Sequence, residues 1–212
     1  MLMPQTTDPQ PFKLSGGHAA LDLVNTLDNR FRSDGPVELL GDYARLLAFT
    51  VQGGLLEPRS ARRLAHTPAA AAQSALQAAH ELREALAAAL YARLEEKPVR
   101  PQDLRTLERQ FHTAAAHREL RWRPSRRHSG DAEFTWDWGR FEAAPGLPVG
   151  LLAQSAAQLL TSSQVDLIRD CGADTCRWLF LDTSRNHTRR WCDMKVCGNR
   201  MKARRFHARH EA

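Results

Sequence analysis

The four cysteines are the residues of this chain whose type and spacing most clearly predict chemistry. Cys171 and Cys176 form one pair and Cys192 and Cys197 a second, with four residues inside each pair and 15 between the pairs. Two such pairs can present four thiolates to one ion in a tetrahedron. Because a full set of protein ligands leaves no open position, we expect one structural zinc ion, with iron as the main alternative and two disulfides as a weaker one.

The finger (residues 165–212) is expected to depend on that metal for its fold. We expect a strand over residues 177–181, a turn, a return strand over residues 189–192 and then a helix over residues 198–210. One stripe of that helix is suited to packing back on the finger: Asn199, Ala203, Phe206 and His210. A segment of about 40 residues buries too little surface to fold on apolar contacts alone, so zinc would supply on the order of 10 kcal/mol of its folding free energy.

Positive charge is concentrated in the finger. The body (residues 1–164) holds 19 basic and 18 acidic side chains, whereas the finger holds 11 and 6. A basic helix beside a zinc-stabilised hairpin is suited to contacting the phosphates and groove edges of DNA. The expected nucleic-acid contacts are Arg190, Arg200, Lys202, Arg204, Arg205 and Arg209. Two alternatives are that some of these cations offset the negative charge of a four-thiolate zinc site, and that the helix only keeps the protein soluble.

A polar stripe near the start of the chain is the second candidate site. Residues 18–29 are expected to form a helix capped by Ser15, with Ala20, Val24 and Leu27 on its apolar side. The opposite side carries the polar stripe: His18, Asp22, Asn25 and Asn29. These side chains could line a ligand pocket or share a metal ion. A solvated or internally hydrogen-bonded face is the favoured interpretation, because one helix supplies at most two ligands.

The remaining body is expected to be helical with one hairpin. The pattern predicts helices over residues 37–52, from about Pro58, and over residues 68–97, 102–117 and 149–161. Apolar residues alternate with polar ones at Leu120 and Trp122 and again from Phe134 to Trp138, which predicts a β-hairpin. We expect its aromatic face to pack on the helices rather than to stack nucleic-acid bases. Its loop adds a lesser basic patch: Arg123, Arg126, Arg127 and His128.

Composition and sequence patterns exclude several classes of protein. With 42% hydrophobic and 25% charged residues, the chain is typical of a globular protein rather than a disordered or fibrous one. No apolar run approaches the roughly 18 residues of a membrane-spanning helix, and the first residues lack a secretory signal. We therefore expect a cytoplasmic protein without a membrane partner, in a compartment that keeps thiols reduced. No catalytic motif with informative context occurs, so we do not expect an enzyme.

The sequence around the cysteines resembles a known family. Cys-x4-Cys followed by Arg-Arg-Trp-Cys-x4-Cys-Gly-Asn-Arg, the latter at residues 189–200, closely resembles the CGNR zinc finger. Leu-Asp-Leu-Val-Asn-Thr-Leu at residues 21–27 resembles the opening signature of the ABATE domain, which usually precedes that finger. The resemblance spans nearly the whole chain. It implies zinc on the four cysteines and a bacterial stress-induced transcription regulator whose finger binds DNA.

The sequence thus predicts an α+β, predominantly helical protein. We expect a helical N-terminal domain with a small β-hairpin over residues 1–164 and a treble-clef-like four-cysteine zinc finger over residues 165–212. Its expected function is that of a zinc-binding transcription regulator that binds DNA, or alternatively RNA, through the finger, with the N-terminal domain sensing a small-molecule effector. The alternative is a small-molecule sensor or cryptic enzyme, with its pocket at the polar stripe and the finger as a structural or protein-interaction element. The oligomeric state stays open, since no heptad seam is evident.

Overall fold

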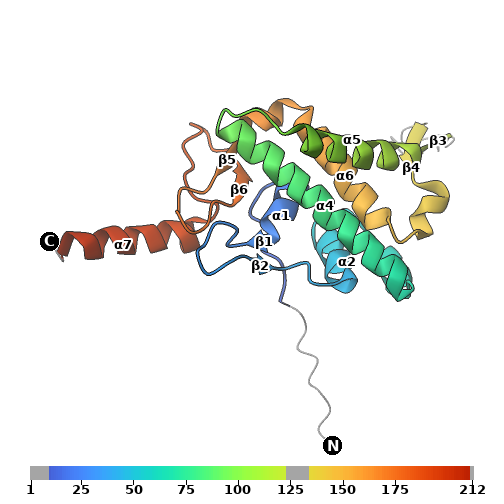
Figure 1. The fold of residues 1–212 in the computed structure, drawn as a ribbon, viewed down its shortest axis with the longest axis horizontal. Coiled ribbons are helices and arrows are strands. Elements are labelled where there is room, and N and C mark those ends of the chain that lie inside the picture. Colours follow the sequence, from blue (N-terminus) through green and yellow to red (C-terminus); the bar gives the residue numbers. More distant parts are fainter. Residues whose placement is uncertain (1–9, 123–133, 211–212) are drawn as a thin grey trace, which may run out of the picture.

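A long central helix organises the body in the computed structural model, which describes residues 10–122 and 134–210 (Figure 1). This helix, α4 (Ala69–Leu94), begins after Pro68, ends before Pro98 and is rich in alanine, the residue with the highest helix propensity. The leucines at four-residue spacing along it, Leu82, Leu86 and Leu90, are at most 1% exposed. They form the centre of the hydrophobic core.

Five further helices complete the body. They are α1 (Ala19–Asn25), α2 (Tyr43–Gln52), α3 (Pro58–Leu64), α5 (Pro101–Ala116) and α6 (Leu147–Leu160). Of these, α5 and α6 pack against α4 and against each other, α1 contacts both α4 and α6, and α3 packs on α2. Short 3-10 turns over Gly139–Ala143 and Ser163–Leu167 precede and follow α6. In the described part of the chain, no helix has both the length and the apolarity needed to cross a bilayer.

The first helix is shorter than expected and is capped differently. Its N-cap is His18, whose Nδ1 accepts a hydrogen bond from the Ala20 N–H at 3.3 Å, so the prediction of Ser15 as N-cap was wrong. The helix ends at Asn25, and the short strand β1 (Leu27–Asp28) then pairs antiparallel with β2 (Val37–Glu38). Because the helix stops before residue 29, the predicted stripe does not continue along one surface.

The predicted hairpin forms, but of its aromatic face only Trp138, just after the second strand, packs on the helical core. Strands β3 (Glu119–Trp122) and β4 (Phe134–Asp137) pair antiparallel, with Leu120 opposite Trp136 and Trp122 opposite Phe134. These four side chains are 57–60% exposed. The hairpin begins where α5 ends and projects beyond the helices (Figure 1), and Trp136 lines a groove beside α5 and α6 without being buried by them. The basic loop residues Arg123, Arg126, Arg127 and His128 lie outside the described residues.

The finger packs against α1 at the end of the molecule away from the hairpin (Figure 1). Strands β5 (Ile168–Asp170) and β6 (Leu179–Leu181) pair antiparallel, so the first cysteine pair lies in the loop between them. The predicted return strand over residues 189–192 was wrong, because β6 pairs with β5 before it. Ile168, Leu179 and Leu181 are at most 3% exposed and belong to the core of the body.

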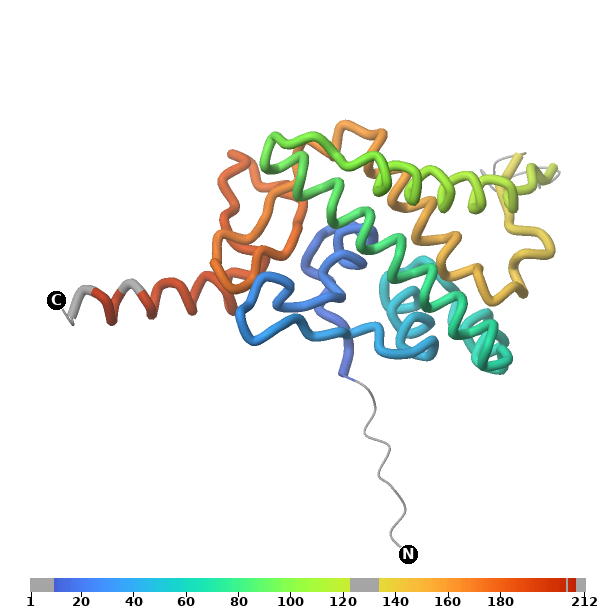
Figure 2. The backbone as a smooth tube through the Cα atoms, viewed as in Figure 1, coloured from blue at the N-terminus to red at the C-terminus, as the bar shows by residue number. Residues whose placement is uncertain are grey.

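The last helix, α7 (Asn199–His210), extends away from the rest of the molecule, as Figure 2 shows. It follows a helical turn over Met194–Gly198, which supplies its principal contacts. Phe206 is 61% exposed and Ala203 is also exposed, so the predicted packing of their stripe on the finger was wrong. Met201 instead packs against the cysteine cluster. The α+β, predominantly helical fold class is confirmed.

Candidate metal centre

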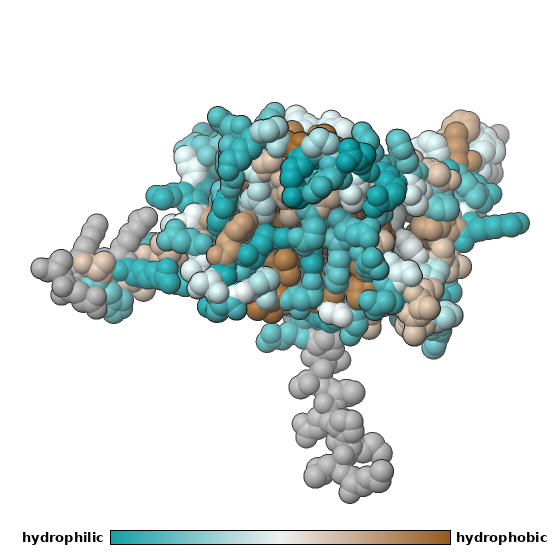
Figure 3. Space-filling model, viewed as in Figure 1, coloured by the Kyte–Doolittle hydropathy of each residue, from teal (hydrophilic) through white to brown (hydrophobic). Residues whose placement is uncertain are grey.

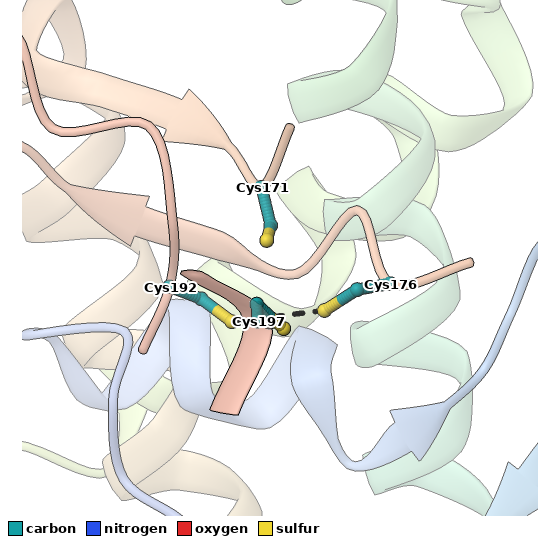
Figure 4. A group of neighbouring side chains, drawn as sticks. All are labelled: Cys171, Cys176, Cys192 and Cys197. Atoms are coloured by element: carbon teal, nitrogen blue, oxygen red, sulfur yellow. Dashed lines mark hydrogen bonds between the residues drawn. The ribbon is translucent and has the colours of Figure 1, made fainter. Parts of the chain in front are cut away.

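Four sulfur atoms converge in the finger. The Sγ atoms of Cys171, Cys176, Cys192 and Cys197 all lie within 4.8 Å of one another, and Figure 4 shows the side chains directed toward a common point. All four cysteines are buried and none forms a disulfide. The structure therefore brings together two pairs that are 15 residues apart in the sequence.

The spacing of these sulfurs fits a tetrahedral zinc ion. The Sγ atoms of Cys176 and Cys192 are 3.6 Å apart, and those of Cys192 and Cys197 are 3.7 Å apart. Four sulfurs at about 2.3 Å from a zinc ion lie about 3.8 Å from one another in a regular tetrahedron. A disulfide would instead require about 2.05 Å. The cluster thus fits one structural zinc ion with four thiolate ligands.

The protonation of the cluster explains why it needs a cation. Hydrogen bonds from the thiols of Cys176 and Cys192 lower the pKa of Cys171 to about 2, and backbone N–H groups of Cys192 and Ala173 act in the same direction. The bond to Cys171 in turn raises the pKa of Cys176 and of Cys192. One thiolate alone would therefore suppress ionisation of its neighbours, whereas a bound divalent metal would hold all four deprotonated.

Backbone turns present each pair of sulfurs. In the first turn, the Cys171 N–H donates to the Trp178 carbonyl at 2.9 Å and the Cys176 N–H donates to the Ala173 carbonyl at 2.8 Å. Arg177 then adopts a φ of 52°, which directs the chain into β6. In the second turn, the Cys197 N–H donates to the Asp193 carbonyl at 2.9 Å. These turns direct the cysteine side chains toward one another.

Asp182 and Arg189 hold the segment between the two turns, where a return strand was expected. The buried Asp182 carboxylate accepts hydrogen bonds from the Ser184 hydroxyl and from the backbone N–H groups of Ser184 and Arg189, and these bonds lower its pKa. The Arg189 guanidinium donates to the carbonyls of Leu181, Trp191, Cys192 and Ser15. Sequence reasoning missed both residues, although an Asp two residues before a Ser is a recognisable turn signal.

The six predicted nucleic-acid contacts do not all share one environment. Arg190, Lys202 and Arg204 are exposed. Arg200 instead donates from Nη2 to the Cys197 Sγ at 3.4 Å, and its Nε is buried. In this position the Arg200 guanidinium would offset thiolate charge, as one of the alternatives for these cations predicts. The side chains of Arg205 and Arg209 lie outside the described part of the chain.

Side chains from the body anchor the finger. Asn25 of α1 donates from Nδ2 to the Leu179 carbonyl and accepts from the Leu179 N–H, both at 2.9 Å, as a neighbouring strand would. The Trp178 indole N–H donates to Asp28 at 2.8 Å, and the Tyr91 hydroxyl donates to the Arg177 carbonyl at 2.8 Å. Asn25 and Leu179 are 154 residues apart in the sequence, so no local pattern could have revealed this pairing.

The polar stripe is divided among three environments. His18 and Asp22 line a shallow pocket of about 280 Å³, and burial lowers the pKa of His18. Asn25 is buried and bonded to β6, so it does not reach that pocket. Asn29, with a φ of 53°, lies on a separate cleft of about 420 Å³ beside the cysteine cluster. The structure therefore does not bring the four side chains together into one pocket.

Asp22→Asn is expected to stabilise the protein above pH 6. Burial raises the pKa of Asp22 to about 6, although the Gly16 N–H, which donates to its carboxylate at 2.8 Å, opposes the shift. Because this folded-state pKa lies above the ordinary value of 3.8, the stability that protonation contributes is present below about pH 4 and is lost as the pH rises through 6. Asparagine keeps an acceptor for Gly16 without the charge, so the gain in unfolding free energy should approach about 3 kcal/mol.

Denaturant unfolding of zinc-loaded protein at pH 5 and pH 8 measures this gain. At pH 5 it should be about half the pH 8 value, because the unfolded carboxyl is already ionised there while the folded one is mostly neutral. Asp34→Asn, at an exposed carboxylate, is the matched control and should change stability by less than about 0.5 kcal/mol at either pH. A destabilised Asp22→Asn variant at pH 8 would contradict a buried, charged Asp22.

Two protein-family models match this chain. The model described as CGNR zinc finger matches residues 168–210, which include all four cysteines. The ABATE model, described as "Putative stress-induced transcription regulator", matches residues 17–163. No protein with curated annotation matches the chain.

Proposed function

Because the chain belongs to the ABATE family of transcription regulators and carries a CGNR zinc finger, we propose that it binds double-stranded DNA through that finger. The observation that carries the proposal is the position of α7, a basic helix that extends from the metal centre into solvent (Figure 1). It contains five Lys and Arg residues and no acidic residue. At about 1.5 Å per residue its 12 residues span about 18 Å, and the major groove of B-DNA admits such a helix.

A further exposed cation, Arg190, lies outside α7 but close to its start. Trp191 packs at the start of α7, since a Cβ on Gly198 would lie 3.2 Å from its Cδ1. The Arg190 guanidinium lies 5.4 Å from the Trp191 ring, at the root of the helix. We define the basic surface as Arg190, Lys202 and Arg204. Zinc would hold the loop and the helix that carry it in one arrangement, which is how a structural metal would contribute to DNA binding.

The proposed activity needs neither catalysis nor an open metal position. Four cysteines fill the coordination sphere of zinc, so the ion supports the fold of the finger. Thiolate ligands persist where thiols stay reduced, which agrees with a regulator acting in the cytoplasm. The alternative function, a sensor with its pocket at the polar stripe, has less support because Asn25 of that stripe is committed to Leu179.

Removing charge from the basic surface should weaken duplex binding. We expect Lys202→Gln with Arg204→Gln to reduce affinity for a generic DNA duplex about tenfold at 0.1 M salt, measured by fluorescence anisotropy. Loss of two phosphate contacts should also make the slope of log affinity against log salt less steep by about 2. Stripping zinc with a chelator should abolish binding, and competition with duplex RNA distinguishes the two nucleic acids.

Arg62→Gln with Arg105→Gln is the matched control. Both arginines are exposed on helices of the body, so this variant loses the same charge outside the finger. It should retain the affinity and salt slope of the unmodified protein. If the two double variants lost affinity for the duplex equally, the effect would come from overall charge and not from the basic surface. No binding by fully zinc-loaded protein at low salt would overturn the proposal.

A further inference from the structure

An aromatic groove lies at the end of the body opposite the finger. This hairpin groove has a volume of about 410 Å³ and is formed by Trp136 and Trp138 of the hairpin region together with alanines of α5 and α6, among them Ala114 and Ala157. Pockets of this size accommodate small organic ligands. Pale and brown side chains gather at this end of the molecule in Figure 3, around the exposed residues of β3 and β4.

The walls of the hairpin groove are held in place by close packing. Trp138 lies on α6 at Gly150, where a Cβ would be 3.1 Å from its Cζ3 atom, so glycine lets the indole contact the helix backbone. Trp138 also packs on Phe141, with ring centroids 5.8 Å apart. A flat apolar molecule would therefore meet a preformed indole surface, and would not have to order it on binding.

One charged group faces this aromatic surface without an ion-pair partner among the described residues. The Arg118 guanidinium lies 4.9 Å from the ring centroid of Trp138 and 5.8 Å from that of Trp136. Its hydrogen-bond partner is the neutral side chain of Gln154, and its Nε is buried with no partner among the described residues. The carboxylates of Glu119 and Asp137, on the strands next to Arg118, both pair with Arg121.

Partial desolvation of this guanidinium is unfavourable, and an anion bound beside it would offset that loss of solvation. Burial lowers the pKa of Arg118, and the negative charge of Asp137 offsets this shift only in part. A guanidinium remains charged at neutral pH and binds carboxylates through paired N–H donors. The buried Arg83, by comparison, pairs with Glu38 and Glu84.

We propose that the hairpin groove binds a small aromatic carboxylate, with the ring stacked on Trp136 and Trp138 and the carboxylate paired with Arg118. The apolar walls and a cation that has no ion-pair partner in the described part of the chain together select this class. An uncharged aromatic compound leaves Arg118 without an anion, and a small polar anion leaves the indoles in water. The site is separate from the metal centre and from the basic surface, so it does not depend on the proposed DNA binding.

Two probes that differ only in charge test this assignment. Calorimetric titration of the zinc-loaded full chain should show 1-naphthylacetate binding about tenfold or more tightly than 1-naphthylacetamide, which is the effect of one charge-assisted hydrogen-bonded pair. In Arg118→Gln this preference should fall to about twofold or less. Trp136→Ala removes a 60% exposed side chain with little effect on the fold, and should weaken both probes alike.

Arg105→Gln is the matched control, because Arg105 is an exposed arginine on α5 outside the hairpin groove. It should keep the preference of the unmodified protein for the carboxylate. Circular dichroism melting confirms that each variant is folded. Equal affinity for the two probes, an unchanged preference in Arg118→Gln, or no binding of either probe at millimolar concentration would overturn the proposal.

Discussion

Cys192→Ser is expected to destabilise the whole protein and not only its finger. The variant should lose stoichiometric zinc, and its unfolding free energy should fall by about 5 kcal/mol or more, since a structural zinc site contributes on the order of 10 kcal/mol. The loss should reach the helices because β5 and β6 place Ile168, Leu179 and Leu181 in the core of the body. Zinc content together with thermal unfolding followed by far- and near-ultraviolet circular dichroism measures both effects.

A chelator applied to the unmodified protein provides the control for this substitution. It should lower the melting temperature in a single transition at both wavelengths, and added zinc should restore it, which separates loss of metal from damage caused by serine. Two transitions, with the helical one unaffected by zinc, would show that finger and body unfold independently. That outcome would contradict the shared core.

Asn25→Ala is expected to be the most destabilising single change in α1. Its amide is the partner of both the N–H and the carbonyl of Leu179, all of them buried. Each buried backbone group left without a partner costs about 1–3 kcal/mol, so the variant should lose about 2–6 kcal/mol of unfolding free energy in denaturant titrations. Because Asn25 also fixes β6 beside the first cysteine pair, zinc should pass to a competing chelator faster.

Asn29→Ala is the matched control for Asn25→Ala. The two asparagines belong to the same polar stripe of the sequence, but Asn29 lies in a turn at a φ of 53° and is not buried. Its replacement should cost only the preference of asparagine for the left-handed region, about 1 kcal/mol, with zinc release unchanged. A cost below about 1 kcal/mol for Asn25→Ala would show that this residue does not anchor the finger.

The sequence by itself determined the chemistry of the metal centre and most of the helical body. Two Cys-x4-Cys pairs were sufficient to predict the four-sulfur cluster, because ligand spacing within a turn is a local property. The long helix could be predicted from Pro68 to Pro98 because proline boundaries and helix propensity act on neighbouring residues. Strand alternation likewise predicted the β3–β4 pairing.

Tertiary structure decided what the polar and aromatic residues do. The sequence shows that Asn25 and Asp22 lie near each other, yet folding bonds one to β6 and the other to Gly16. It offers six basic residues of the finger as nucleic-acid contacts, yet folding directs one of them, Arg200, back to the Cys197 sulfur. The sequence also did not reveal which segment pairs with β6, because both residues 168–170 and residues 189–192 were candidates. The structure pairs β6 with residues 168–170.

The physical reason for this division is the range of the interactions. Helix propensity, turns and ligand spacing depend on residues a few positions apart, and they are readable along the chain. Burial and hydrogen-bond partners depend on segments that meet only after folding, such as α1 and β6, or α5, α6 and the hairpin. The position of Arg118 beside two indoles belongs to this second class, because it depends on how folding brings α5 and the hairpin together and pairs Glu119 and Asp137 with Arg121.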